Sequence, residues 1–129
     1  MCSIRTAESV CAGHPDKLAD QIADQILDDI LYDDKAARVA VEVMAAGRRI
    51  IVTGEITTNH RPRIRESVRT ALARAGYSPL GILIYVWTRR QSSDINAGVT
   101  TSLEARGGDS SAFALQGAGD QGTVYGLSL

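Results

Sequence analysis

The sequence predicts an α+β protein, a two-layer sandwich with the order β-α-β-β-α-β and both helices on one face of a mostly antiparallel sheet. Three observations support this fold class. Residues 15–32 repeat apolar side chains at helical spacing, and residues 38–58 alternate on either side of a short turn. Residues 81–87 form a compact apolar strand after a second helical segment. The 129 residues are enough for one hydrophobic core and too few for two comfortable domains.

The first expected elements are an extended segment over residues 5–10 and a helix over residues 15–32. Pro15 suits the first helical position because its missing N–H would have no partner there. Asp24 and Asp28 project to the polar side of this helix, whereas Asp16 and Asp20 point into an apolar arc. That arc holds Ala23, Leu27 and Leu31. A carboxylate that faces the protein needs a partner such as a cation.

A hairpin and a second α/β pair complete the expected domain. Val39, Val41 and Val43 share one face of the strand over residues 38–45, residues 46–48 form the turn, and residues 50–58 form the second strand. The second helix opens at Pro62 and stops at Gly76. The third strand of this unit follows over residues 81–87.

The chain changes character after the last strand. Residues 89–116 have no periodic apolar pattern and are rich in Ser, Thr, Gly, Asp and Arg, which is typical of a functional loop or a disordered segment. A glycine-dense turn over residues 117–122 precedes what looks like the start of another strand.

Composition excludes several classes of protein. A net charge of −1 gives no general attraction to nucleic acid or to an anionic membrane. Two cysteines cannot form a disulfide framework, which favours a reducing compartment. The N-terminus has no apolar signal-peptide core and no apolar run approaches membrane-spanning length, so we expect a cytoplasmic protein.

The segment Gly13-His14-Pro15-Asp16 combines three groups that suit a nucleotide and a metal ion. The helix start presents free backbone N–H groups and a partial positive charge, which favour phosphates. His14 offers an imidazole, and Asp16 offers a hard oxygen ligand for Mg²⁺. Plain helix capping explains the same residues equally well.

Two carboxylates lie in strands that are otherwise poor in charge. Glu42 and Glu55 become near-neighbours when the hairpin pairs about its turn, and a buried carboxylate there would need a cation. The alternative is that one or both face solvent. Gly54 marks a close approach by another backbone or by a ligand. Gln91, directly after the last strand, offers donors and acceptors for an amino-acid ligand.

Taken together, these segments closely resemble the S-adenosylmethionine synthetases (methionine adenosyltransferases). The matching motifs stand in the same order and at similar spacings: Glu8-Ser-Val, Gly13-His-Pro-Asp-Lys, Gly54-Glu-Ile-Thr-Thr, Gln91-Ser-Ser-Asp-Ile and Gly117-Ala-Gly-Asp-Gln-Gly. The resemblance implies a transferase that forms S-adenosylmethionine from ATP and L-methionine and releases phosphate and diphosphate, with Mg²⁺ and K⁺ as cofactors. It also implies homo-oligomers that pack through their sheet faces.

The resemblance also implies a role for each matching residue. His14 would be the catalytic, ATP-contacting histidine. Asp16 would be a Mg²⁺ ligand and Glu42 a K⁺ ligand, while methionine would contact Glu55, Gln91 and Asp120. Residues 1–88 would be the N-terminal domain, residues 89–116 a flexible gating loop, and residues 117–129 the start of the following domain.

Family members are considerably longer and carry further cationic site residues beyond the equivalent of residue 129. The sequence therefore allows two hypotheses about the function of the chain. The chain is the N-terminal part of an adenosyltransferase and is inactive alone, or it is an inert homologue that works only as a binding or association module.

Overall fold

The computed structural model describes residues 6, 8–90, 103–108 and 110–111. The chain divides into two compact units, residues 11–92 and a second unit formed by residues 1–10 with 93–129. The first unit contains, in order, α1 (Pro15–Asp33), β1 (Arg38–Ala46), β2 (Arg49–Thr57), α2 (Ile64–Arg74) and β3 (Leu83–Arg89). The second unit contains the short helix α4 (Leu103–Arg106), within the segment expected to be a gating loop.

The three strands form one mixed sheet in the order β1-β2-β3. β1 and β2 pair antiparallel as the expected hairpin, whereas β2 and β3 pair parallel. The prediction of a mostly antiparallel sheet was therefore wrong. α2 is the reason, because a crossover helix returns the chain to the end of the sheet where β2 begins, so that β3 runs in the same direction.

The extended segment expected at residues 5–10 is not a strand where the structure describes it. Thr6 and residues 8–10 belong to no regular element, and residues 5 and 7 lie outside the described part. The order observed in the described residues is therefore α-β-β-α-β. The α+β class and the five remaining elements, two helices and three strands, are confirmed.

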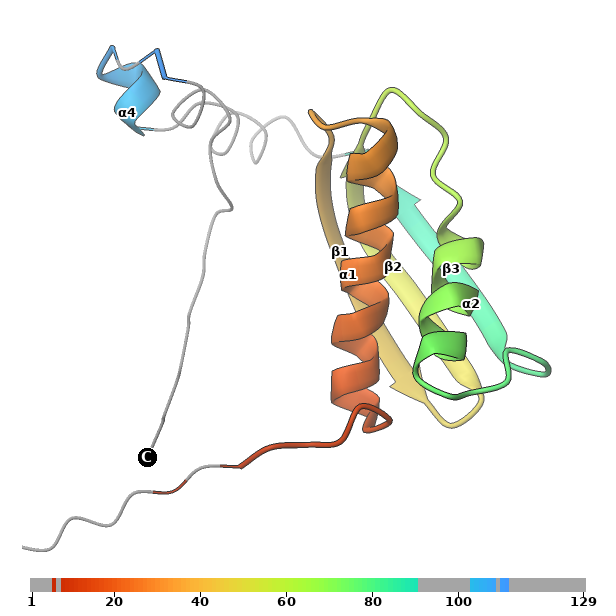
Figure 1. Ribbon diagram of the computed structural model, residues 1–129. Coiled ribbons are helices and arrows are strands. Elements are labelled where there is room, and N and C mark those ends of the chain that lie inside the picture. The colour runs from red at the N-terminus through yellow and green to blue at the C-terminus, as the bar shows by residue number, and fades with distance from the viewer. Residues whose placement is uncertain (1–5, 7, 91–102, 109, 112–129) are drawn as a thin grey trace, which may run out of the picture. The chain divides into compact units, whose positions relative to one another are not determined.

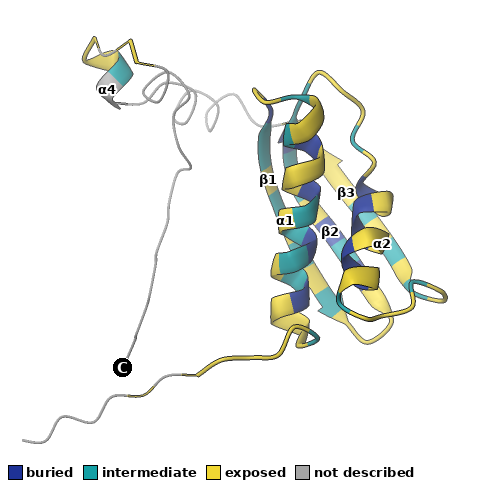
Figure 2. Cartoon of the chain, in the orientation of Figure 1, coloured by how far each residue is buried: buried dark blue, intermediate teal, exposed yellow. Residues whose placement is uncertain are grey.

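Both long helices cover the same face of the sheet, as expected (Figure 1). The core lies between the two layers, and the buried positions line the facing sides of helices and strands (Figure 2). Its members are Leu18, Ile22, Ile26, Ile30, Ala37, Ile50, Val52, Ile56, Ile64, Val68, Ala71 and Leu72. Alternation places the odd-numbered valines of β1 and the even-numbered apolar residues of β2 toward the helices.

The buried stripe of α1 is narrower than the sequence pattern predicts. Leu18, Ile22, Ile26 and Ile30, spaced by four residues, are buried. Asp16 and Asp20 are both exposed, and Leu27 is 36% exposed. The prediction that these two carboxylates point inward was wrong. The buried side of α1 follows the row of residues spaced by four, from Leu18 to Ile30, and the side that holds Leu27, Asp16 and Asp20 lies at the edge of the helix–sheet contact.

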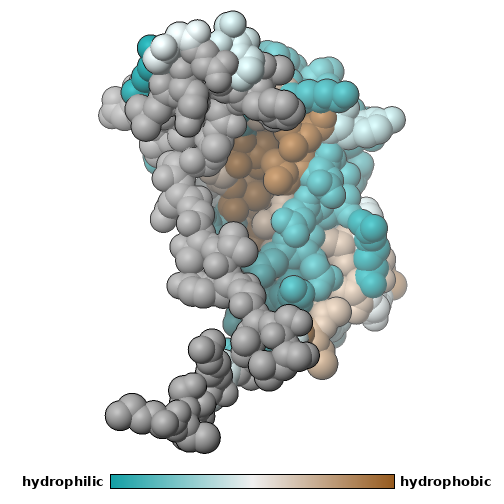
Figure 3. Space-filling model, turned by 60° about the vertical axis from the view of Figure 1, so that its left-hand side comes forward, coloured by the Kyte–Doolittle hydropathy of each residue, from teal (hydrophilic) through white to brown (hydrophobic). Residues whose placement is uncertain are grey.

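The opposite face of the sheet carries no helix in the described residues, and we call it the open face. Its members alternate with the core positions along each strand: Ala40, Glu42, Met44, Ile51, Thr53, Glu55, Leu83, Tyr85, Trp87 and Arg89. Met44, Leu83, Tyr85 and Trp87 are all exposed. Turned so that the β1 side comes forward, the molecule shows a hydrophobic area bordered by hydrophilic residues (Figure 3).

None of the described helices is long and apolar enough to cross a membrane.

Candidate functional site

The start of α1 is built around His14. The backbone N–H of His14 donates to the Cys11 carbonyl at 2.9 Å, which closes a turn, and Pro15 occupies the first helical turn. His14 itself is the N-cap residue, with extended φ and ψ of −64° and 139°. Its Nδ1 accepts a hydrogen bond from the backbone N–H of Asp16 at 3.3 Å. The cap occupies Nδ1 and leaves Nε2, the second nitrogen of the ring, to contact a ligand.

The carboxylate of Asp16 is the most exposed group of this corner. Its side chain is 90% exposed, and Oδ2 lies 3.8 Å from His14 Nδ1. No group of three or more metal-ligating side chains occurs among the described residues. A single exposed carboxylate nevertheless fits Mg²⁺, which is commonly held by one or two carboxylates together with phosphate oxygens and water.

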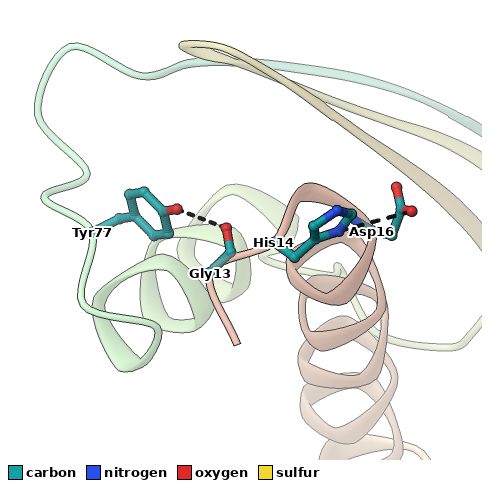
Figure 4. A network of polar contacts seen from close by, with 4 residues as sticks. All are labelled: Gly13, His14, Asp16 and Tyr77. Carbon is teal, nitrogen blue, oxygen red and sulfur yellow. Dashed lines mark hydrogen bonds and ion pairs between the residues drawn. The ribbon is translucent and has the colours of Figure 1, made fainter. Parts of the chain in front are cut away.

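A contact from the segment after α2 fixes the turn that presents His14. The hydroxyl of Tyr77 donates to the Gly13 carbonyl at 2.8 Å (Figure 4). A Cβ at Gly13 would lie 3.0 Å from that hydroxyl oxygen, so glycine allows the close approach. On the other side, the Gln21 amide donates to the Ala12 carbonyl at 3.1 Å.

Tyr77 reaches this position because of the way α2 ends. Gly76 has a φ of +85°, the N–H of Tyr77 donates to the Leu72 carbonyl at 2.9 Å, and the N–H of Gly76 donates to the Ala73 carbonyl at 3.0 Å. This pair of bonds is the Schellman motif. Sequence reasoning identified the Gly76 stop but missed Tyr77, because no local pattern links two residues that are 64 positions apart.

The two predicted sheet carboxylates lie on the open face, in different surroundings. Glu42 pairs with Thr53 across the hairpin and is exposed, so for this residue the solvent-facing alternative is the observed one. The side chain of Glu55 is 11% exposed, and its Oε1 accepts from Arg89 Nε at 3.0 Å. Since Ala40 is the partner of Glu55 in β1, the two carboxylates are diagonal neighbours on one face.

Gly54 shows the close approach that its sequence position indicated. Its φ is +125°, and a Cβ there would collide with the Ala40 carbonyl oxygen and lie 2.9 Å from Val41 Cα. The approaching group is the backbone of β1, so this glycine lets the hairpin pair directly beside Glu55.

The predicted site residues therefore fall into two groups. His14 and Asp16 lie at the start of α1 in the helix layer, and Glu42 and Glu55 lie on the open face of the sheet. Gln91 and Asp120 lie outside the described residues. A pocket of about 400 Å³ lies elsewhere, between the C-terminal half of α1 and the start of α2, and no predicted site residue lines it.

Comparison with known proteins identifies the family. Residues 3–96 match the family described as the N-terminal domain of S-adenosylmethionine synthetase. The chain belongs to the S-adenosylmethionine synthetase family. The resemblance stated from the motifs is thereby confirmed.

Individual relatives agree with this membership. The chain is 45% identical over 130 residues to the S-adenosylmethionine synthase of Finegoldia magna, which covers 95% of the chain and 33% of that protein. It is 40% identical over 132 residues to the synthase of Nocardioides sp., with 95% and 33% covered. The chain therefore spans about one third of the length of these relatives.

A solved structure shares the fold. The structure described as an unusual S-adenosylmethionine synthetase from Campylobacter jejuni superposes with a TM-score of 0.61 at 33% sequence identity. The match covers 70% of this chain and 26% of the Campylobacter chain.

Proposed function

We propose that this chain takes part in forming S-adenosylmethionine from ATP and L-methionine, as the N-terminal part of a methionine adenosyltransferase that releases phosphate and diphosphate. The observation that carries the proposal is the corner at the start of α1. There a helix start, a partly exposed imidazole that caps the helix through Nδ1, and an exposed carboxylate occur together in a member of this family.

Each group at this corner would act on the triphosphate. The first backbone N–H groups of α1 and its dipole favour a polyanion, and His14 would donate from Nε2 to a triphosphate oxygen. Asp16 would hold Mg²⁺, which neutralises phosphate charge when it is bound. A displacement at carbon needs alignment of its partners, which a pinned turn at residues 11–14 helps to supply.

The remaining family roles complete the proposal. Glu42 would be a ligand of K⁺, and Glu55, Gln91 and Asp120 would contact methionine. Residues 1–88 would form the N-terminal domain, residues 89–116 a gating loop over the site, and residues 117–129 the start of the next domain. The protein would work in the cytoplasm as a homo-oligomer.

The first experiment uses the purified 129-residue chain. Mixed with ATP, methionine, Mg²⁺ and K⁺, it should form little or no S-adenosylmethionine, because a triphosphate needs more cations than this corner supplies. Product measured by chromatography, after contaminating host enzyme has been excluded, would contradict this expectation.

The second experiment restores the missing two thirds. A chimera in which this chain replaces the matching third of the Finegoldia magna synthase should form S-adenosylmethionine. Within it, Asp16→Asn should raise the Mg²⁺ concentration needed for half-maximal rate by about tenfold or more. Asp24→Asn, which changes an exposed carboxylate on the same helix, is the matched control. An unchanged Mg²⁺ requirement in Asp16→Asn would refute the assignment of that residue.

The alternative function is an inert association module, and the exposed apolar side chains of the open face favour it. The chimera separates the two proposals, because an inert module gives a folded chimera without product.

A further inference from the structure

The turn that precedes α1 has a hydrogen bond on each of its four carbonyl oxygens. Backbone N–H groups of the turn and of α1 donate to the first and the last of them, the carbonyls of Cys11 and His14. The Gln21 amide, which belongs to α1, donates to the second at 3.1 Å. The third, the Gly13 carbonyl, instead accepts from the Tyr77 hydroxyl, 64 residues away, at 2.8 Å. The end of the turn therefore depends on a side chain from outside the helix that it begins.

The bond from Tyr77 acts on the peptide group that leads into His14. The Gly13 carbonyl and the His14 N–H belong to one planar peptide group. The Tyr77 hydroxyl holds one edge of this plane, and the Cys11 carbonyl holds the other edge by accepting from the His14 N–H at 2.9 Å. Rotation of His14 about φ, which is −64°, is measured from that plane. The two bonds therefore help to fix the direction in which the His14 side chain leaves the backbone (Figure 4).

The position of Tyr77 is itself held on both sides. Its backbone N–H donates to the Leu72 carbonyl at 2.9 Å, in the motif that ends α2. The segment that follows is tied to the hairpin by Arg48, which donates to the carbonyls of Leu80 and Gly81 at 3.1 Å each. A hydroxyl carried by a segment with such ties can orient a group at the start of another helix.

From this geometry we infer that Tyr77 is a positioning residue of the reaction: its hydroxyl holds the peptide group of His14 and so directs the imidazole toward the triphosphate. The inference rests on the proposed function, which supplies the contact between His14 and the triphosphate. Tyr77 touches no substrate and acts through His14. Misplacing a group at a reacting centre by about 1 Å can cost a factor of about 100 in rate, so one distant hydroxyl has a measurable effect.

Amide hydrogen exchange, followed by NMR on the 129-residue chain, tests this contact without any enzyme activity. Tyr77→Phe keeps the ring and removes the hydroxyl. The N–H groups of His14 and Asp16 should then exchange about threefold to tenfold faster, because each donates within the loosened turn. Amides of β2 should keep their rates, since only a loss of global stability would change them. The matched control is Tyr32→Phe, which removes the hydroxyl of a tyrosine of α1 that is 88% exposed.

Two results of this measurement overturn the inference. One is equal exchange of the His14 and Asp16 amides in Tyr77→Phe and in the unaltered chain. The other is faster exchange of all amides, including those of β2, which would mean that Tyr77 contributes only to stability.

The chimera with the Finegoldia magna synthase measures the consequence for the reaction. Tyr77→Phe should lower kcat by about tenfold and leave the KM for methionine unchanged, because methionine does not contact the start of α1 in the proposed function. Tyr32→Phe should change neither value. An unchanged kcat in Tyr77→Phe, or a change in the KM for methionine alone, would contradict a role through His14.

A double-mutant cycle separates action through His14 from a loss of folded enzyme. In a His14→Asn background, with product followed from radiolabelled methionine, Tyr77→Phe should lower the rate by less than about twofold, because the imidazole that it positions is gone. A smaller folded fraction would lower the rate by the same factor in both backgrounds. Equal factors would therefore overturn the inference, and circular dichroism checks that each variant is folded.

The proposed function and this inference fail in different ways. A folded chimera without product refutes the proposed function. An active chimera in which Tyr77→Phe keeps its full rate refutes the inference alone. The exchange measurement needs no product, so it decides in either case whether Tyr77 orders the turn before His14.

Discussion

His14 has a structural task that is separable from its proposed contact with ATP. Its Nδ1 caps α1 by accepting from the Asp16 N–H, and Nε2 would contact the triphosphate in the proposed function. His14→Ala should lower the free energy of unfolding by about 0.5–1 kcal/mol, because one N–H of the first turn loses its acceptor. His14→Asn should restore stability, since asparagine is a good cap, without restoring the imidazole.

Urea denaturation of the two variants measures this difference, and the chimera measures their activity. Equal stability of His14→Ala and the unaltered chain would show that the cap contributes nothing. Recovery of activity by His14→Asn would show that the ring nitrogen facing the ligand has no role.

Asp34 makes stability depend on pH. The pKa of its carboxyl group lies below the usual 3.8, chiefly because the backbone N–H of Asn59 donates to it, and further because the Thr58 hydroxyl does so. A lowered folded-state pKa stabilises the protein above the unfolded pKa, and that stability is lost as the pH falls through the folded-state value. Acid should therefore lower the urea midpoint.

Asp34→Asn should lower the urea midpoint at neutral pH and reduce its fall in acid, because asparagine does not titrate. The control is Asp28→Asn, which changes an exposed carboxylate of α1. Urea midpoints measured at neutral pH and below pH 3.8 compare the variants. If acid lowers the urea midpoint of Asp34→Asn as much as that of the unaltered chain, other carboxyl groups cause the acid sensitivity.

At the scale of elements, local patterns predicted more than the pairing between elements. Period-four apolar spacing predicted the buried positions of α1, and the turn at residues 46–48 predicted that β1 and β2 pair as a hairpin with Glu42 and Glu55 as near-neighbours. The parallel pairing of β3 was missed, because a short apolar run such as residues 81–87 does not show in which direction the strand pairs. The contact of Tyr77 with Gly13 was missed for the related reason that it depends on how two helices pack.

In the candidate site, too, neighbours in sequence were predictable and contacts between separate elements were not. The helix-start motif identified His14 and Asp16 as neighbours, which they are. The partner of Glu55 was not predicted, because Arg89 belongs to a strand whose direction the sequence pattern leaves open.

Gly54 tests the pairing of the hairpin. Gly54→Ala should cost about 2–3 kcal/mol or more, because alanine disfavours a φ of +125° and its Cβ would collide with the Ala40 carbonyl oxygen. Gly47→Ala is the matched control, since Gly47 has a φ of +57° with nothing within 4 Å of an added Cβ. It should cost about 1–2 kcal/mol. Urea denaturation gives both values. Equal costs would mean that β1 can shift away from the added Cβ at residue 54 without a loss of stability.

At the scale of the whole molecule, the open face is the feature that a single copy leaves unexplained. Met44 is 54% exposed and Leu83 is 51% exposed, on a sheet whose other face packs against both helices. Contiguous apolar surface of this kind is rare on monomers and marks an interface. We therefore expect the chain to self-associate through the open face, as the family resemblance also implies.

Sedimentation velocity at micromolar concentration tests this expectation. The unaltered chain should sediment as a dimer or larger species, and Met44→Glu or Leu83→Glu should shift it toward monomer, because each buries an unpaired charge in the interface. Leu80→Glu is the matched control, since Leu80 is 83% exposed but lies in the segment before β3 rather than on the sheet. A clean monomer for the unaltered chain, or an equal shift for all three variants, would refute association through this face. In that case, the exposed residues of β1 and β3 would need another protein segment to cover them.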